Sequence, residues 1–133
     1  MSQMGIQMHV KSDTKKSGNG RRKVKIRDRR RSETGNYFSA TKLADSNANQ
    51  SIRRRGGTMA VRLKKAAVVN LLTKDGYKKA KITSILESKD NRNFARQKII
   101  TKGSILVTEL GNAVVTNRPG REGSINAKLV KVQ

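Results

Sequence analysis

The residues most able to do chemistry in this sequence are its lysines and arginines. The 133-residue chain carries 31 of them against 9 acidic residues, which gives a formal net charge of +22 at pH 7. Three runs of consecutive cations occupy residues 21–23, 29–31 and 53–55. Soluble domains usually hold a net charge of magnitude about 2 to 8, with both signs interspersed. Because crowded like charges repel until phosphates lie between them and counterions are released, the pattern predicts a polyanionic partner.

Catalytic constellations need residues that this sequence largely lacks. His9 is the single histidine, cysteine is absent, and the carboxylates are scattered without metal-ligand spacing. A cysteine nucleophile and a thiolate metal site are therefore excluded, and a Ser-His-Asp arrangement would have to use His9. The glycine-rich segment 18–20, just before Arg21, lacks the Walker pattern that cradles phosphates. We expect no enzymatic activity, no cofactor, no metal and no small-molecule substrate.

The expected polyanion is nucleic acid rather than a membrane surface. A membrane-binding helix needs bulky apolar residues opposite its basic face, yet the chain has no tryptophan and no stretch near about 18 consecutive apolar residues. RNA is favoured over DNA because an arginine-rich, glycine-spaced arm suits folded RNA, and no helix-turn-helix, zinc finger or basic zipper pattern is present. A DNA-coating protein stays open as an alternative. Tyr37 and Phe38 can either stack on an unpaired base or pack onto the folded domain.

The first part of the chain is poor in residues that build a core. Residues 11–31 hold eleven basic residues, and Val24 and Ile26 are their strongly apolar side chains. Such a segment cannot bury enough apolar surface to offset its ordering entropy. We therefore predict a long basic N-terminal extension that lacks its own core and becomes ordered on its partner.

A glycine pair marks the predicted boundary between the two parts. Gly56 and Gly57 follow the third cationic run, and residues without side chains let the backbone turn sharply. We interpret them as the hinge between the extension, residues 1–57, and a folded domain, residues 58–133.

The second part is predicted to be mostly β. Short runs rich in Val, Ile and Leu are separated by turn signals at residues 74–76, 101–103, 110–112 and 119–123. The run 66–72 fits a strand or a helix turn by periodicity, and its paired valines and the Asp-Gly turn after it favour a strand.

Alternating apolar residues indicate which strand faces turn inward. The clearest set is Ile125, Ala127 and Leu129, and a weaker set is Ala80, Ile82 and Leu86. Five or six short strands in about 75 residues predict a small closed or nearly closed β-barrel, because closure removes exposed strand edges.

Longer motifs occur in both parts of the sequence. Those of the second part are residues 53–57, 62–63, 99–103, 108–111 and 115–123, and those of the first part are residues 15–18, 21–23, 29–35 and 40–41. Together they resemble the S8e family of small-subunit ribosomal proteins of archaea and eukaryotes. The chain departs from the family pattern at residues 36–39, where Asn-Tyr-Phe-Ser replaces a proline-containing stretch. Its compact length is similar to the archaeal version.

The resemblance implies a structural, cytoplasmic protein of the small ribosomal subunit. Its barrel would sit on the 30S particle while its extension threads into small-subunit ribosomal RNA, and other small-subunit proteins would be its neighbours. A ribosome-assembly factor is an alternative, because a family of such factors shares a similar barrel. The cations expected to contact RNA are Lys15, Lys16, Arg21, Arg22, Lys23, Lys25, Arg27, Arg29, Arg30, Arg31, Lys42, Arg53, Arg54, Arg55 and Arg62.

Overall fold

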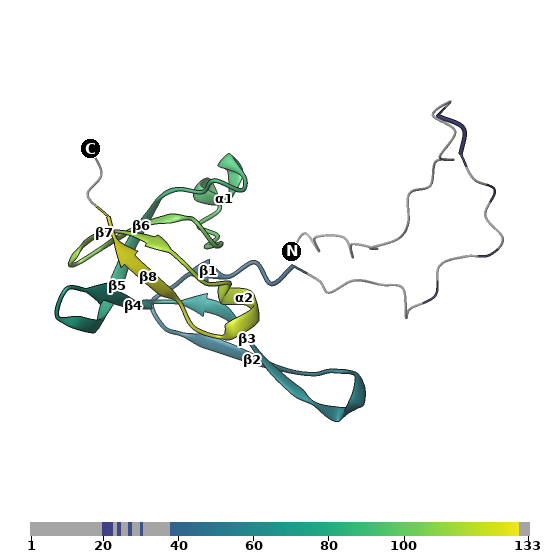
Figure 1. Cartoon of the computed structure of the whole chain (residues 1–133), viewed down its shortest axis with the longest axis horizontal. Helices are drawn as coiled ribbons and strands as arrows, with labels where there is room; N and C mark the ends of the chain where they lie inside the picture. Colours follow the sequence, from purple (N-terminus) through teal and green to yellow (C-terminus); the bar gives the residue numbers. More distant parts are fainter. Residues whose placement is uncertain (1–19, 23, 25–26, 28–29, 31–37, 131–133) are drawn as a thin grey trace. The chain divides into compact units, whose positions relative to one another are not determined.

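Figure 1 shows a computed structural model of the chain, which describes residues 20–22, 24, 27, 30 and 38–130. The chain forms two compact units, Met1–Phe38 and Ser39–Gln133. The second unit is mostly β, as predicted. Its elements in chain order are β1 (Lys42–Leu43), β2 (Ala48–Arg53), the 3-10 turn η2 (Arg55–Gly57), β3 (Met59–Ala66), β4 (Val68–Thr73), β5 (Gly76–Glu87), α1 (Arg92–Arg96), β6 (Ile105–Thr108), β7 (Gly111–Val115), α2 (Pro119–Glu122) and β8 (Asn126–Leu129).

Five strands close into a barrel in the order β4-β5-β6-β7-β8. Neighbouring strands run antiparallel except at the closure, where β4 and β8 pair in parallel with Leu71 opposite Ala127. Across this seam, Asn70 Nδ2 donates a hydrogen bond of 3.1 Å to Asn126 Oδ1. Each of the five strands therefore has two partners, and the prediction of a small closed barrel is confirmed.

Small and branched apolar side chains fill the barrel. Val69 and Leu71 of β4, Leu106 of β6 and Ala113 of β7 are each 0% exposed. Leu63 of β3 packs into the same cluster from outside the barrel strands. Since burying one large aliphatic side chain is worth about 1.5–3 kcal/mol, a chain with two phenylalanines and no tryptophan can still build its core from these residues.

The longest strand, β5, departs from the predicted alternation. Ala80 and Ile82 are buried as expected, but Leu86 is 55% exposed and Ile85 packs against the core instead. The pairing of β5 with β6 shifts register between Ile82 and Ser84, and again after Ile85. An extra residue at a bulge moves the later side chains to the other face of the strand. The prediction that Leu86 faces inward was therefore wrong.

The last strand follows its predicted pattern over most of its length. Ile125 and Ala127 are buried. Leu129 is more than a third exposed, because it lies at the end of β8 and of the barrel.

Predicted turns join the strands at two hairpins. Gly76 begins β5 with a φ of 118°, and Gly111 begins β7 with a φ of 122°. A threonine closes each turn, since Thr73 Oγ1 donates to the Gly76 carbonyl at 2.7 Å and Thr108 Oγ1 donates to the Gly111 carbonyl at 2.6 Å. The turn expected at residues 119–123 is instead the short helix α2, which lies beside the base of the β2–β3 hairpin.

A second sheet has the order β1-β3-β2. Strands β1 and β2 lie within residues 1–57, the predicted extension, yet they pair with the two sides of β3. Because β2 is an edge strand with mostly exposed side chains, it holds its place through backbone hydrogen bonds and needs few apolar residues. The compact unit accordingly begins at Ser39 rather than at residue 58.

The glycine pair has a different place from the predicted one. Gly56 and Gly57 have φ values of 82° and 81° and lie in the turn that joins β2 to β3. The sharp reversal expected of them is present, but it closes a hairpin within one folded unit. The interpretation of this pair as a hinge between two domains was wrong.

Hydrogen bonds tie the segment before β2 to the rest of the unit. Thr41 Oγ1 donates to the Leu63 carbonyl at 2.7 Å, and the Ile100 N–H donates to the Thr41 carbonyl at 2.8 Å. Asn47 Oδ1 accepts a bond of 2.7 Å from the Ala67 N–H at the corner between β3 and β4. These bonds satisfy backbone groups at the edge of the core, so this segment belongs to the fold.

Truncation tests this boundary. A chain beginning at Ser39 retains every described strand and should unfold in a single cooperative transition. A chain beginning at Thr58 lacks β1 and β2, so Leu63 on β3 loses both flanking strands and the thermal midpoint should fall. Circular dichroism melting of the two truncated chains measures the difference, and equal midpoints would contradict a folded unit that starts at Ser39.

Substitutions in the core test the assignment of strand faces. Leu106→Ala should lower the free energy of unfolding by about 2–5 kcal/mol, because it leaves a cavity in the barrel. Leu86→Ala is the matched control and should change it by less than about 1 kcal/mol, since that side chain is largely exposed. Urea denaturation at constant salt measures both, and equal losses would argue against the bulged register of β5.

Candidate nucleic-acid interface

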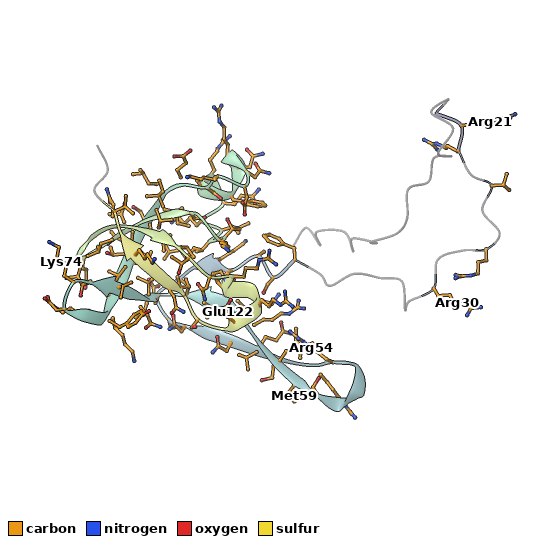
Figure 2. All side chains as sticks on the ribbon, in the orientation of Figure 1. Arg21, Arg30, Arg54, Met59, Lys74 and Glu122 are labelled. Carbon is orange, nitrogen blue, oxygen red and sulfur yellow. The ribbon has the colours of Figure 1, made fainter. Side chains whose placement is uncertain are left out.

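A polar hollow of about 490 Å³ lies between the β2–β3 hairpin and two loops of the barrel. The loops are those before β6 and after β7, and the second of them contains α2. The residues that line the hollow are Arg54, Lys102, Thr116, Asn117, Arg118, Arg121 and Glu122. Figure 2 labels Arg54 on the hairpin and Glu122 on α2. Four cations from three separate segments therefore gather around one concave surface.

Asn117 fixes the loop that carries two of these arginines. Its Nδ2 donates to Glu122 Oε2 at 3.0 Å and to the Ser124 carbonyl at 2.8 Å. Its Oδ1 accepts a bond of 3.0 Å from the Asn126 N–H at the start of β8. One side chain thus joins both ends of the loop, so the backbone of the arginine-bearing helix has little freedom.

Two glycines let this loop pack closely, one against Ser39 and the other against the β2–β3 hairpin. A Cβ atom at Gly120 would lie 2.6 Å from the Ser39 Cβ, which is closer than real side chains approach. A Cβ atom at Gly123 would lie 3.0 Å from Val61 Cγ1, and the φ of 74° at Gly123 also disfavours a side chain. The close approach of α2 to the segment before β1 therefore depends on Gly120, and its close approach to β3 depends on Gly123.

Lys102 extends from a turn that buried hydroxyl groups hold in place. The Thr101 N–H donates to Ser104 Oγ at 3.1 Å, and the Oγ1 of Thr101 lies 3.0 Å from the same Oγ. Ser88 Oγ lies 3.1 Å from Thr101 Oγ1, and the Gly103 N–H donates to the Val115 carbonyl at 2.8 Å. The backbone beneath Lys102 is consequently tied to β7 and to the end of β5.

The hairpin turn places Arg54. Its N–H donates to the Thr58 carbonyl at 2.7 Å, and its carbonyl accepts a bond of 3.2 Å from the Gly57 N–H. The chain reverses over η2, so the Arg54 side chain starts at the base of the turn, beside the hollow.

Within the described part of the chain, no ion pair neutralises the cations of the hollow. Residues 39–130 contain nineteen lysines and arginines against six carboxylates. None of the four hollow cations forms an ion pair with another residue in the described part of the chain, whereas Lys78 Nζ and Asp75 Oδ2 pair elsewhere at 3.3 Å. Cations grouped in a concavity concentrate anions, and arginine can hold a phosphate through two parallel hydrogen bonds. The arrangement can therefore bind a phosphate group.

The predicted contact residues of the second unit are dispersed. Arg54 lines the hollow, and Arg53 and Lys42 are exposed on β2 and β1. Arg55 begins η2. Arg62 on β3 is only 6% exposed, so its side chain is not open to a large ligand.

The predicted contact residues of the first unit are described in part. Arg21, Arg22, Arg27 and Arg30 are exposed. Phe38 is partly exposed. The remaining predictions for this unit, at Lys15, Lys16, Lys23, Lys25, Arg29, Arg31, His9 and Tyr37, fall outside the described residues.

Sequence reasoning missed three cations of the hollow. Each of them is an isolated cation beside a glycine or a proline: Lys102 precedes Gly103, and Arg118 and Arg121 flank a Pro-Gly pair. Such segments indicate turns. A loop with two arginines around a Pro-Gly pair was the available clue, because loops carry binding residues more often than strands do.

The described part of the chain lacks the features of two other kinds of site. No group of three or more His, Cys, Asp or Glu residues there could hold a metal ion. No helix there is long and apolar enough to cross a membrane.

Comparison with known proteins identifies the family. The model of the family described as ribosomal protein S8e matches residues 10–130. A relative named small ribosomal subunit protein eS8, from Sulfurisphaera tokodaii, is 44% identical over 114 residues, which are 84% of this chain and 89% of that protein. A protein of the same name from Sulfolobus acidocaldarius is 43% identical over 84% of this chain and 89% of its own length. Another, from Hyperthermus butylicus, is 38% identical over 90% of this chain and 90% of its own length. With a match of this extent, the chain belongs to the ribosomal protein S8e family.

Proposed function

We propose that the chain is a structural constituent of the small ribosomal subunit that binds and stabilises ribosomal RNA and so supports translation. The observation that carries the proposal is the basic hollow, whose four cations lack ion-pair partners among the described residues. The relatives are named as small-subunit proteins, which supplies the particle. Other small-subunit proteins are the expected neighbours, and the ribosome in the cytoplasm is the expected location.

The two units would contribute in different ways. The folded unit presents cations from rigid turns, so it can seat itself on RNA in a defined orientation. The first unit would supply further phosphate contacts through its cationic runs, including the exposed Arg21, Arg22, Arg27 and Arg30. Arginine suits both tasks, because its planar fork can hold a phosphate and stack on a base.

Such a role is structural and calls for no catalytic step. Each phosphate that a cation neutralises releases counterions, so binding should weaken steeply as salt rises, by about 0.7 to 0.9 log units per contact for a tenfold change in salt. RNA helices that repel one another could then be held together by a chain placed between them.

Sedimentation tests the proposed particle. The tagged full chain, expressed in an archaeon such as Sulfolobus acidocaldarius that has its own eS8 protein, should migrate with small ribosomal subunits in a sucrose gradient at moderate salt. It should be released at high salt. A basic protein of equal net charge, unrelated to ribosomes, is the control for non-specific adhesion and should not show this preference. The proposal would be rejected if the tagged chain stayed at the top of the gradient.

Comparison of nucleic acids tests the choice of RNA against the DNA-coating alternative. At matched salt, the full chain should bind fragments of small-subunit ribosomal RNA at least about tenfold more tightly than duplex DNA, since irregular RNA offers junctions where several phosphates converge. Fluorescence anisotropy over a salt series measures both affinities. Equal affinities with equal salt slopes would favour a DNA-coating protein.

A further inference from the structure

The hollow contains one group that simple phosphate attraction does not explain. Glu122 places a carboxylate among four cations, where it repels any phosphate that enters. It does not neutralise those cations either, because no cation of the described residues lies within ion-pair distance of it. Its Oε2 accepts the bond from Asn117, and its Oε1 accepts none from a described residue. This second oxygen is available to a donor on a ligand.

RNA is a ligand that satisfies both kinds of group at once. Each nucleotide carries a phosphate for the cations and a 2′-hydroxyl that can donate to a carboxylate, and DNA lacks that hydroxyl. A volume of about 490 Å³ lies within the usual range of ligand sites, roughly 300–1,000 Å³. The lining contains no aromatic ring, so it offers a base nothing to stack on. The chemistry favours the sugar and phosphate over the base.

We propose that the hollow binds one ribose–phosphate unit of RNA, with the phosphate held by the cations of α2 and its neighbours and the 2′-hydroxyl donating to Glu122. This inference rests on the proposed RNA-binding function and deepens it. The site would make the folded unit selective for RNA, whereas cationic runs alone attract any nucleic acid. Glu122 is then a specificity-determining residue, and Arg118 and Arg121 are phosphate ligands.

The geometry of the site is set before a ligand arrives. Asn117 holds Glu122 Oε2 at 3.0 Å, and the same side chain anchors the loop to β8. Gly123 lets the end of α2 lie close to Val61 in the hairpin that carries Arg54, and Gly120 lets the helix lie close to Ser39. Because the carboxylate and the arginines share one short, fixed loop, the distance between them can be matched in advance to the spacing of the 2′-hydroxyl and the phosphate in RNA.

The first test separates the 2′-hydroxyl from the phosphate. A short single-stranded RNA and its 2′-O-methyl counterpart have the same charge and a similar sugar pucker, but only the first can donate to Glu122. The wild-type full chain should bind the RNA at least about fivefold more tightly, as loss of a hydrogen bond to a charged group implies. Glu122→Gln keeps an acceptor for Asn117 and should bring the ratio of the two affinities close to one. The 2′-O-methyl strand should bind the variant more tightly than it binds the wild-type chain.

Any of three results would overturn the assignment of Glu122. One is a ratio of the two affinities equal to one in the wild-type chain. Another is a ratio that is the same in Glu122→Gln as in the wild-type chain. A preference for one base that persists on the 2′-O-methyl strand would show that the carboxylate reads a base amino group instead. Thermal melting of both proteins controls for folding, and Glu122→Gln should melt close to wild type because the loop bonds are kept.

The second test concerns the arginines and uses a control of equal charge. Arg118→Ala with Arg121→Ala should weaken RNA binding at least about tenfold more than Lys79→Ala with Lys81→Ala, which removes two exposed cations from β5. The slope of log affinity against log salt concentration should flatten by about 1.4 to 1.8 in the hollow variant, as expected for two lost phosphate contacts.

If the two double variants lose the same affinity, the hollow is ordinary charged surface. A chain that sediments with small subunits yet shows no effect of either hollow variant would refute the site and leave the proposed function standing.

Discussion

Four cations that form no ion pair within the described part of the chain surround the hollow, and an apolar core supports the turns that carry them. Each cation would have a lower free energy if it were dispersed in water, because like charges in a concavity repel one another. The apolar residues pack inside a barrel of five closed strands. Turns that connect these strands carry three of the cations, and the hairpin of Arg54 packs Leu63 into the same core, so the barrel keeps the cations close together. An anion bound there would relieve this repulsion, so the charge that opposes folding of the free chain would favour the proposed complex.

The short helix α2 shows how close packing converts separate loops into one site. It contains Arg121 and Glu122, with Arg118 as its N-cap, and its position depends on Gly120, which lies close to Ser39, and on Gly123, which lies close to Val61 of the hairpin. The second sheet matters for the same reason, since β3 contributes Leu63 to the core at one end and continues into the hairpin of Arg54 at the other. Burial of apolar groups in the barrel therefore sets the spacing of charged groups outside it.

Much of the fold followed from local patterns. Asp-Gly and Leu-Gly turns marked two hairpins, and the alternation in Ile125 and Ala127 gave the correct face of β8, because short-range backbone preferences decide these features. Leu86 was misassigned since bulges reverse the alternation, and a bulge depends on the partner strand. Strand β2 was overlooked because an edge strand can be polar, being held by backbone bonds that leave little trace in composition.

The amino-acid sequence alone predicted a polyanionic partner and determined the class of fold. Net charge is a sum over residues and does not depend on their arrangement, and hydrophobic alternation acts between near neighbours along the chain. Tertiary structure alone decided which cations act together. The four cations come from three separate parts of the sequence, with Arg118 and Arg121 in the same loop, and they converge because β2–β3, the turn before β6 and α2 meet beside one barrel. Packing buries Arg62, which looked equally available. A binding site depends on distances in space, and those are fixed only when the core brings distant segments together.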